Sequence, residues 1–260
     1  MSAPVLKVVK IGGNVVDSPE ALREFASLFA RLDGPKILVH GGGKEATRLS
    51  AALGIETRMI DGRRVTDAAT IDVVTMVYAG LINKRVVALL QSLGVNAMGV
   101  CGADASLIKA VRRPAAPVDY GFVGDISTEG VNTGYIAKMI SDGITPVFCA
   151  ITHDGAGRLL NCNADSVASA VAVAMSRKMD TELYYCFEKI GVLSDPDDPN
   201  SLITEIDTES FAEYKEKGIV SGGMIPKIAN SITAVNQGVR KVHIKLAKNL
   251  LNFVGTEIKL

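Results

Sequence analysis

Two glycine-rich turns and a few isolated charged residues could do chemistry in this chain. The turn VVKIGG places Gly12 and Gly13 after Lys10, and the turn LVHGGGK places three glycines, 41–43, before Lys44. Both turns follow an apolar, strand-like run. Backbone N–H groups exposed at the start of a helix form a ready site for an anion. The two turns therefore predict a site for phosphate or another anionic ligand, although each could also be a simple tight bend.

The turn HGGGKEA departs from the two best-known phosphate loops. A Walker A loop requires G-x-x-x-x-G-K-[ST], but Leu38 occupies the first glycine position and Glu45 replaces the Ser/Thr. The dinucleotide pattern G-x-G-x-x-G is met only if Ala46 is accepted in its last place. That match also follows the second expected strand instead of the first. A dinucleotide-dependent oxidoreductase is therefore a remote alternative.

Isolated charged residues could complete an anion site. Lys10 interrupts an apolar strand, where lysine is rarely buried unless it is paired, so we expect it to face an anion. Lys227 follows Pro226 at the start of a helix, where the helix dipole disfavours a cation unless an anion compensates it. Asp165 precedes an alanine-rich helix and could also serve as its cap. Arg64, in DGRRVTD, either completes the anion site or is a solvated arginine.

Composition excludes several classes of function. Lys+Arg and Asp+Glu balance at 28 each, which argues against a nucleic acid or an anionic membrane as partner. The longest apolar run, 171–175, is far shorter than the ~20 residues that span a bilayer. The histidines have no metal-ligand spacing, and no serine lies in G-x-S-x-G. We read the cysteines as reduced core residues, which fits the cytoplasm; they are Cys101, Cys149, Cys162 and Cys186.

Strand-like and helix-like segments alternate along the chain. Apolar, β-branched runs predict strands at Leu6–Ile11, Ile37–His40, Val95–Cys101, Pro146–Ile151, Leu183–Phe187 and Val242–Leu246. Helical periodicity predicts helices at Pro19–Leu32, Ala46–Leu53, Ala68–Leu93, Thr133–Ser141, Ser166–Arg177, Thr208–Lys217 and Pro226–Gln237. Such alternation predicts an α/β fold with a mainly parallel sheet, whose ligands bind at the carboxyl ends of the strands.

Two features divide this regular pattern. The segment Lys109–Glu129 contains Arg112, Arg113, prolines and glycines, which predicts an irregular hairpin or flap over a site. A soft boundary at Ser176–Thr181 divides the chain into two lobes, residues 1–176 and 177–260, of one continuous sheet.

Five separated motifs together resemble the amino acid kinase family. They are VKIGG, LVHGGG, DGRRVTD, LNCNADSVASA and GGMIPK, in family order and spacing between Lys7 and Leu260. The resemblance implies a three-layer α/β/α sandwich around a mainly parallel sheet, in a single kinase domain. It also implies transfer of a phosphoryl group from ATP, with Mg²⁺ carried by the nucleotide. The motifs are most similar to those of the enzymes that phosphorylate the γ-carboxylate of N-acetyl-L-glutamate in arginine biosynthesis.

The resemblance assigns a role to each candidate residue. Lys10 and Lys227 would stabilise the transferring phosphoryl group, and Asp165 would hold both ammonium groups. A carboxylate acceptor is already ionised near neutral pH, so no general base is required. The remaining assignments are phosphate binding by Gly12 and Gly13, acceptor binding by Gly42, Gly43, Arg64 and Asn161, and nucleotide binding by Glu188, Gly191, Val192, Leu193 and Gly223. Residues 1–176 would bind the acceptor and dimerise, and residues 177–260 would bind the nucleotide.

The sequence departs from the family at one strand end. Phe187-Glu188-Lys189 stands where relatives have Thr/Ser-Asp-Val beside the nucleotide. This departure keeps a catalytically weak, ligand-sensing homologue as an alternative, and a sibling kinase for aspartate, glutamate, carbamate or UMP is another. Arg112 and Arg113 are expected to be solvated; alternatively they would bind the second carboxylate of N-succinyl-L-glutamate. The first strand begins too early for the helix that arginine-inhibited relatives carry, so we expect a homodimer insensitive to arginine.

Overall fold

One eight-stranded sheet organises the chain. The computed structural model describes residues 4–60, 62–195, 197–198, 200–220 and 224–260. The strand order is β14-β16-β15-β11-β1-β2-β8-β5, and every neighbouring pair is parallel except β15 and β16. The strands are β1 Leu6–Ile11, β2 Lys36–His40, β5 Ala97–Val100, β8 Thr145–Phe148, β11 Thr181–Phe187, β14 Glu205–Ile206, β15 Lys241–Leu246 and β16 Thr256–Ile258.

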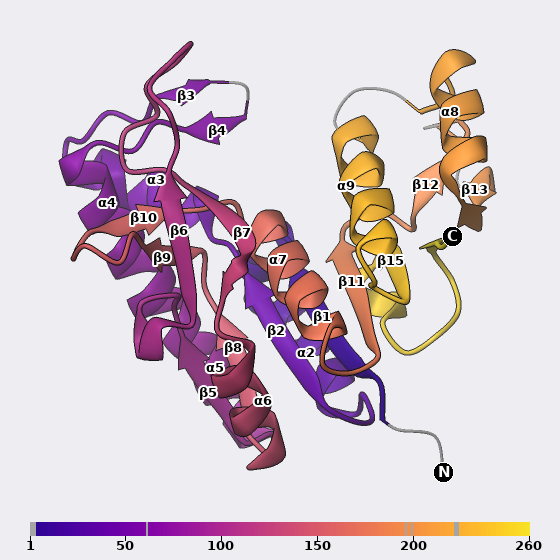
Figure 1. Cartoon of the computed structure of the whole chain (residues 1–260), viewed down its shortest axis with the longest axis horizontal. Helices are drawn as coiled ribbons and strands as arrows, with labels where there is room; N and C mark the ends of the chain where they lie inside the picture. Colours follow the sequence, from indigo (N-terminus) through magenta and orange to yellow (C-terminus); the bar gives the residue numbers. More distant parts are fainter. Residues whose placement is uncertain (1–3, 61, 196, 199, 221–223) are drawn as a thin grey trace.

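Helices cover both faces of this sheet, because its central strands are apolar on both sides. Val8 of β1 packs into one core, which α6, α7 and α9 complete. Its neighbour Val9 packs into a second core, which α2, α4 and α5 complete. In Figure 1, α7 and α9 lie in front of the central strands. The three-layer α/β/α sandwich with a mainly parallel sheet is confirmed. The helices are α1 Gly13–Val16, α2 Pro19–Ala30, α3 Gly43–Ala52, α4 Ala68–Thr75, α5 Asn83–Ser92, α6 Thr133–Ser141, α7 Ala164–Ser176, α8 Thr208–Glu216 and α9 Met224–Asn236.

Smaller sheets extend the fold above the carboxyl ends of the strands. The four-stranded sheet has the order β10-β9-β6-β7, and two hairpins pair β3 with β4 and β12 with β13. The predicted hairpin is confirmed, because β6 and β7 pair antiparallel around the Arg113–Val123 loop. The other short strands were not predicted, since two or three residues show no alternation. The strands of the smaller sheets are β3 Met59–Ile60, β4 Arg63–Arg64, β6 Ile108–Arg112, β7 Gly124–Val131, β9 Ile151–His153, β10 Leu159–Asn161, β12 Val192–Leu193 and β13 Leu202–Ile203.

The predicted helix 68–93 is continuous but not uniform. Its middle, Met76–Ile82, is a π-helix between α4 and α5, so the side chains after it turn relative to a regular helix. The whole segment, Ala68–Ser92, is much longer than the 171–175 run, and by length and composition alone it could cross a membrane. Its residues Val74, Val77 and Val86 are instead buried in the core on one face of the sheet. It is a core helix of this fold.

Several predicted element boundaries were wrong in ways that affect the site. The run 146–151 is not one strand: β8 ends at Phe148, and Ile151 begins β9 in the smaller sheet. Helices α3 and α7 begin earlier than predicted, at Gly43 and Ala164. Gly43 and Asp165 therefore belong to first helical turns, where N–H groups lack partners within the helix.

Candidate active site

The two glycine turns lie side by side because β1 and β2 are adjacent parallel strands. Ile11 of β1 is in register with His40 of β2, so the turns after them leave the same edge of the sheet. Helix α3 begins directly in the second turn, with Gly42 as its N-cap. The first N–H groups of a helix are free to bind an anion. The geometry thus supplies free backbone donors at the start of α3, whereas the Gly12 N–H, predicted to bind phosphate, donates instead to the Cys186 carbonyl at 3.0 Å.

Gly42 is required by a close approach of the π-helical segment. A Cβ atom on Gly42 would lie 2.2 Å from the Ile82 side chain and 3.2 Å from the Tyr78 ring. Any side chain there would push the second glycine turn away from η1, Met76–Ile82, or displace that segment. The turn is therefore packed closely against the helix, which fixes the direction of its N–H groups.

His40 fixes the carbonyl side of the same turn. Burial lowers the pKa of His40 to about 4, so its ring is neutral at physiological pH. The Asn83 amide group donates to His40 Nε2 at 3.1 Å and to the Val147 carbonyl at 2.9 Å. Nε2 is thus the acceptor, and Nδ1–H donates to the Gly41 carbonyl at 2.9 Å. No sequence pattern predicted this role of His40, because a lone histidine at a strand end has many roles.

Arg64 ties the second glycine turn to the β3–β4 hairpin. Its side chain is buried, and Nη2 donates to the Gly43 carbonyl at 2.9 Å and to Thr47 Oγ1 at 2.8 Å. Nη1 donates to Thr57 Oγ1 at 3.1 Å. The guanidinium group is therefore held rigidly, and the solvated alternative for Arg64 is wrong.

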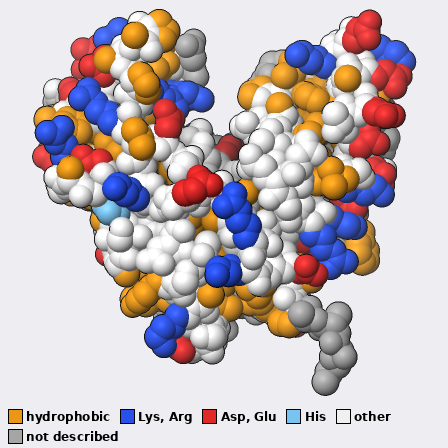
Figure 2. Space-filling model, viewed as in Figure 1, with side chains coloured by type: hydrophobic (Ala, Val, Ile, Leu, Met, Phe, Trp, Pro, Cys, Tyr) orange, Lys and Arg blue, Asp and Glu red, His pale blue; other side chains and the backbone are white. Residues whose placement is uncertain are grey.

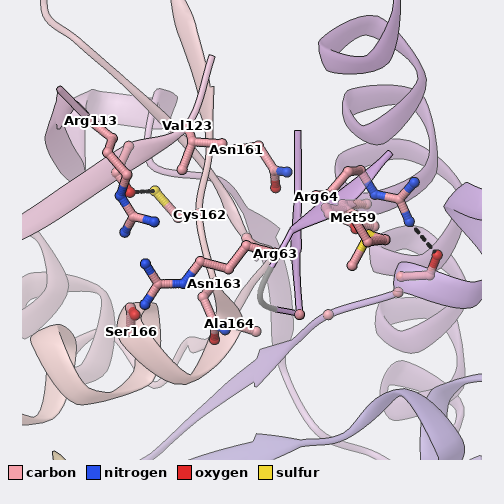
Figure 3. Close-up of a pocket in the computed structure, with 17 residues that line it drawn as sticks. Met59, Arg63, Arg64, Arg113, Val123, Asn161, Cys162, Asn163, Ala164 and Ser166 are labelled. Atoms are coloured by element: carbon pink, nitrogen blue, oxygen red, sulfur yellow. Dashed lines mark hydrogen bonds between the residues drawn. The ribbon is translucent and has the colours of Figure 1, made fainter. Parts of the chain in front are cut away.

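A cavity of about 230 Å³ lies beside Arg64 and the glycine turn. Figure 3 shows Arg64 on one side of it and the guanidinium groups of Arg63 and Arg113 on the other. Among the described residues that line the cavity there are three arginines and no carboxylate. Such a lining is suited to an anionic ligand with more than one negatively charged group.

The cavity brings together four of the predicted residues. Gly42, Gly43, Arg64 and Asn161 all line it. Further lining residues that were not singled out beforehand include Met59, Arg63, Tyr78, Gly124, Cys162, Asn163 and Ser166. Met59 and Arg63 come from short strands and Tyr78 from the π-helix, where the sequence carries no periodic signal, whereas Asn163 and Ser166 stand at the start of α7.

The wall opposite Arg64 is formed by β10 and β7. Asn161 donates from Nδ2 to Thr66 Oγ1 at 3.0 Å, which fixes the orientation of its amide. The adjacent Cys162 thiol donates to the Gly124 carbonyl at 3.2 Å, and burial raises the pKa of Cys162 to about 11. The thiol is therefore neutral and forms part of the wall without a charge.

Arg112 and Arg113 have different surroundings, although they are neighbours. Arg112 is half-exposed and pairs with Asp119 at 3.2 Å. Arg113 pairs with Asp125, but its side chain is only 19% exposed and lines the cavity. Its Nη1 is buried and has no hydrogen-bond partner among the described residues. The prediction of a solvated surface charge was therefore wrong for Arg113, which presents an unsatisfied donor.

Lys10 and Asp165 form an ion pair next to the cavity. Lys10 Nζ lies 2.8 Å from Asp165 Oδ1. Helix α7 is capped by Asn163, whose side chain accepts a hydrogen bond from the Asp165 N–H at 2.7 Å. The cap predicted for Asp165 is thus supplied by Asn163, which leaves the Asp165 carboxylate available to Lys10. Ala164 and Ser166, on either side of Asp165, both line the cavity.

Lys227 lies in α9 and approaches the Lys10–Asp165 pair. Its ammonium lies over the Phe187 ring, 4.3 Å from the ring centroid, at the carboxyl end of β11. Burial lowers the pKa of Lys227, and the nearby Asp165 charge opposes that shift. Because β11 is adjacent to β1, with Tyr185 in register with Lys10, the two lysines approach the same strand ends. Figure 2 shows the surface hollowed between the part carrying β3 and β4 and the part carrying α8 and α9.

The predicted nucleotide residues lie along the chain after β11. Glu188 is exposed, and Leu193 is half-buried. Gly191 and Val192 are buried against β16: a Cβ on Gly191 would lie 2.7 Å from Thr256 Oγ1, which accepts the Val192 N–H at 2.8 Å. Close packing thus explains this glycine without a ligand. Gly223 lies outside the described residues. Within the described ranges, no group of three His, Cys, Asp or Glu side chains is arranged to hold a metal ion.

Comparisons with known proteins identify relatives of the whole chain. A sequence model described as "Amino acid kinase family" matches residues 6–245. The acetylglutamate kinase of Phocaeicola vulgatus is 50% identical over 254 residues, which cover 98% of each chain. The acetylglutamate kinase of Methanopyrus kandleri is 39% identical over 98% of this chain and 100% of its own length. Among solved structures, N-acetylglutamate synthase from Neisseria gonorrhoeae matches with a TM-score of 0.81 at 21% identity, over 98% of this chain and 59% of that one.

Proposed function

The chain belongs to the amino acid kinase family, and from this we infer that it catalyses the acetylglutamate kinase reaction of arginine biosynthesis. In this reaction ATP phosphorylates the γ-carboxylate of N-acetyl-L-glutamate. The observation that carries the inference is the cavity lined by three arginines and no carboxylate among the described residues, beside the Lys10–Asp165 pair. An acceptor with two carboxylates and no positive charge fits this lining.

We propose that Arg64 and Asn161 bind the α-carboxylate of the acceptor. Arg64 is buried and oriented by hydrogen bonds to Gly43 and Thr47, and a planar guanidinium suits a carboxylate. The N–H groups of Gly42 and Gly43, at the start of α3, would then meet the γ-carboxylate or the phosphoryl oxygens. This arrangement aims the reacting carboxylate along the edge of the sheet toward β1.

The chemistry needs positive charge more than it needs a base. A γ-carboxylate has a pKa of about 4.3, so it is already ionised and can attack the γ-phosphorus directly. The new bond joins a carboxylate oxygen to phosphorus, the bond to the bridging oxygen breaks, and ADP leaves. Lys10 and Lys227 would neutralise the charge that spreads over the phosphoryl oxygens, with Asp165 holding Lys10 in place. The retained lysines also argue against a catalytically weak, ligand-sensing homologue.

We propose that ATP lies at the carboxyl ends of β1 and β11, with its phosphates over Gly12 and Gly13. The segment from Glu188 to Leu193, together with Gly223, would bind the rest of the nucleotide; residues 177–260 would then form the nucleotide lobe and residues 1–176 the acceptor lobe. Because no described carboxylate cluster suits a metal ion, Mg²⁺ would be held through the nucleotide phosphates. The ion would neutralise phosphate charge.

A second acceptor is favoured by one observation. Arg113 Nη1 is buried at the cavity without a hydrogen-bond partner among the described residues. A buried N–H donor without an acceptor is costly, and an additional carboxylate would satisfy it. N-succinyl-L-glutamate carries such a group at the end of its acyl chain, whereas an acetyl group ends in a methyl.

We also propose a homodimer in the cytoplasm. Strand β5 is an edge strand of the large sheet and carries Met98, which is 47% exposed. Unpaired edge strands are usually covered, and a second copy pairing along β5 would extend the sheet across both subunits. The four free cysteines suit a reducing compartment. Light scattering of the purified protein, compared with a Met98→Lys variant, would measure the oligomeric state.

The proposed reaction is tested by trapping its product. Purified protein would be incubated with ATP, Mg²⁺ and hydroxylamine, and acyl phosphate would be detected as a hydroxamate. N-acetylglutamate, N-succinylglutamate, glutamate and aspartate would be compared, each with an ATP-free control. We expect hydroxamate from an N-acylglutamate; its absence with both acylglutamates would refute the proposal.

A further inference from the structure

The two lysines of the site are held by different kinds of group. Lys10 is paired with the Asp165 carboxylate at 2.8 Å. Lys227 has no ion pair among the described residues; its ammonium lies 4.3 Å from the centroid of the Phe187 ring and 5.9 Å from that of Tyr185. Phe187 and Tyr185 are two residues apart in β11, so both rings stand on the same face of the strand.

An aromatic ring can hold a lysine without neutralising it. The face of the ring attracts an ammonium through its quadrupole, most strongly where water is excluded. The ring accepts no full hydrogen bond, so the three N–H donors of the lysine stay available to another partner. A carboxylate in the same place would consume part of the charge that phosphoryl transfer needs.

Phe187 is itself fixed by its surroundings. Its side chain is 9% exposed and belongs to the core between the sheet and α7 and α9. The first glycine turn passes directly over it, because a Cβ on Gly12 would lie 3.6 Å from Phe187 Cβ. The Phe187 side chain therefore lies against both the first glycine turn and the ammonium of Lys227.

The charged groups around Lys227 act on its pKa in opposite directions. Burial lowers the pKa of Lys227, and the like charge of Lys10 lowers it further, while Asp165 and Glu188 raise it. Asp165 is already paired with Lys10. A contact that favours the ammonium form would oppose this lowering of the Lys227 pKa.

We propose that Phe187 is a positioning residue, whose ring keeps Lys227 charged and directed at the phosphoryl group through a cation–π contact. Its effect on turnover rests on the kinase function proposed above, whereas the contact itself does not. Phe187 stands where relatives have Thr or Ser, and this departure from the family pattern thus acquires a role. The Tyr185 ring, whose centroid lies 5.9 Å from the Lys227 ammonium, would add a weaker cation–π contact.

The contact can be measured without any activity. In protein labelled with ¹³C-lysine, the ε-CH₂ group of Lys227 is assigned as the signal lost in Lys227→Arg. We expect ring currents to shift its protons upfield of the other lysines, and we expect Phe187→Leu to abolish that shift. A Lys227 signal among the exposed lysines in the unmodified protein would overturn the proposal, even if Phe187→Leu does not fold.

The effect on turnover is measured with matched variants. Phe187→Leu keeps an apolar side chain but removes the ring, and we expect kcat to fall about tenfold. The alkaline limb of the kcat–pH profile should move to lower pH, because the charged lysine loses support, while the acceptor KM changes little. Phe187→Tyr keeps the ring and should restore both kcat and the limb.

Phe148→Leu is the control for lost packing. Phe148 is fully buried in the same core and has no lysine over its ring among the described contacts. We expect this variant to lower Tm without moving the alkaline limb. If the unmodified protein is active but Phe187→Leu behaves like Phe148→Leu, the proposal is wrong. If the unmodified protein makes no hydroxamate, the kinase function fails, and the lysine shift alone decides whether the contact exists.

Discussion

Lys10 Nζ and Asp165 Oδ1 lie 2.8 Å apart and join the end of β1 to the first turn of α7. The two residues are 155 positions apart by their numbers in the sequence, and only the parallel sheet brings them together. Asp165 lies in the first turn of α7, at the positive end of the helix dipole. The pair therefore presents a fixed ammonium at the edge of the cavity.

Asp165→Asn tests this pair. The amide has nearly the same shape but no charge, so Lys10 would lose its electrostatic partner and its fixed direction. We expect kcat to fall by about tenfold or more while the fold is retained. The hydroxamate assay measures kcat, and circular dichroism checks the fold. A variant with unchanged kcat would show that the pair is only structural.

Arg64→Lys tests the acceptor site. Lysine keeps the charge but cannot form the paired N–H contacts that a guanidinium makes with a carboxylate. We expect the KM for the acceptor to rise about tenfold with a smaller change in kcat. Arg48→Lys, on the exposed side of helix α3, to which the Arg64 side chain is hydrogen-bonded, is the control and should change neither constant. Equal KM values for the acceptor in the two variants would show that Arg64 does not bind the acceptor.

His40 predicts a pH dependence of stability. Its pKa is about 4 in the folded protein and 6.5 as a model value, so the unfolded chain binds more protons between these pH values. The free energy of unfolding should therefore decrease as pH falls from 6.5 to 4, by at most about 1.4 kcal/mol per pH unit. Urea unfolding across this range measures the slope.

His40→Asn is the variant that identifies the source of that slope. It removes the titrating ring, so the dependence between pH 6.5 and 4 should flatten. Glu182 titrates separately: its pKa is lowered to about 2, chiefly by the His243 ring 3.5 Å away, so its stabilising effect is lost only below the ordinary value of 4.5. Glu182→Gln should therefore leave the slope of the unfolding free energy between pH 6.5 and the ordinary glutamate pKa of 4.5 unchanged. A slope that persists in His40→Asn would assign it to other groups.

Arg113→Ala tests which acyl group the acceptor carries. If Arg113 binds a terminal carboxylate, the variant should lose kcat/KM for N-succinylglutamate by about tenfold or more. Activity with N-acetylglutamate should change much less, because the methyl group offers no partner. Arg112→Ala, which removes the neighbouring pair with Asp119, is the matched control. Equal losses with both acceptors would argue against a second carboxylate.

The sequence predicted the sheet well because its strands are strongly apolar. The predicted bounds of the first strand, Leu6–Ile11, and of helix Thr133–Ser141 agree with the structure. The break after Phe148 was missed because the apolar run continues through Ile151 into a different sheet. The π-helix at Met76–Ile82 was missed because its residues remain apolar and helical in composition.

Apart from the residues in motifs, the sequence singled out a site residue only where its type conflicts with the strand or helix around it. Lys10 in an apolar strand and Lys227 at a helix start both showed such a conflict, and both lie near the ends of β1 and β11. Arg113 and Tyr78 showed none. Their positions depend on tertiary packing of the flap and of the π-helix against the glycine turn. A single sequence carries little information about such packing.

The most direct test is a comparison of the unmodified protein with Lys227→Ala, using ATP and the N-acylglutamate that the protein prefers. Steady-state hydroxamate formation gives kcat and the acceptor KM. We expect kcat to fall by about 10² to 10³, because Lys227 acts on charge that develops in the transition state, while KM stays within about threefold. An unchanged kcat, or a loss confined to KM, would contradict the proposed role of the two lysines in phosphoryl transfer.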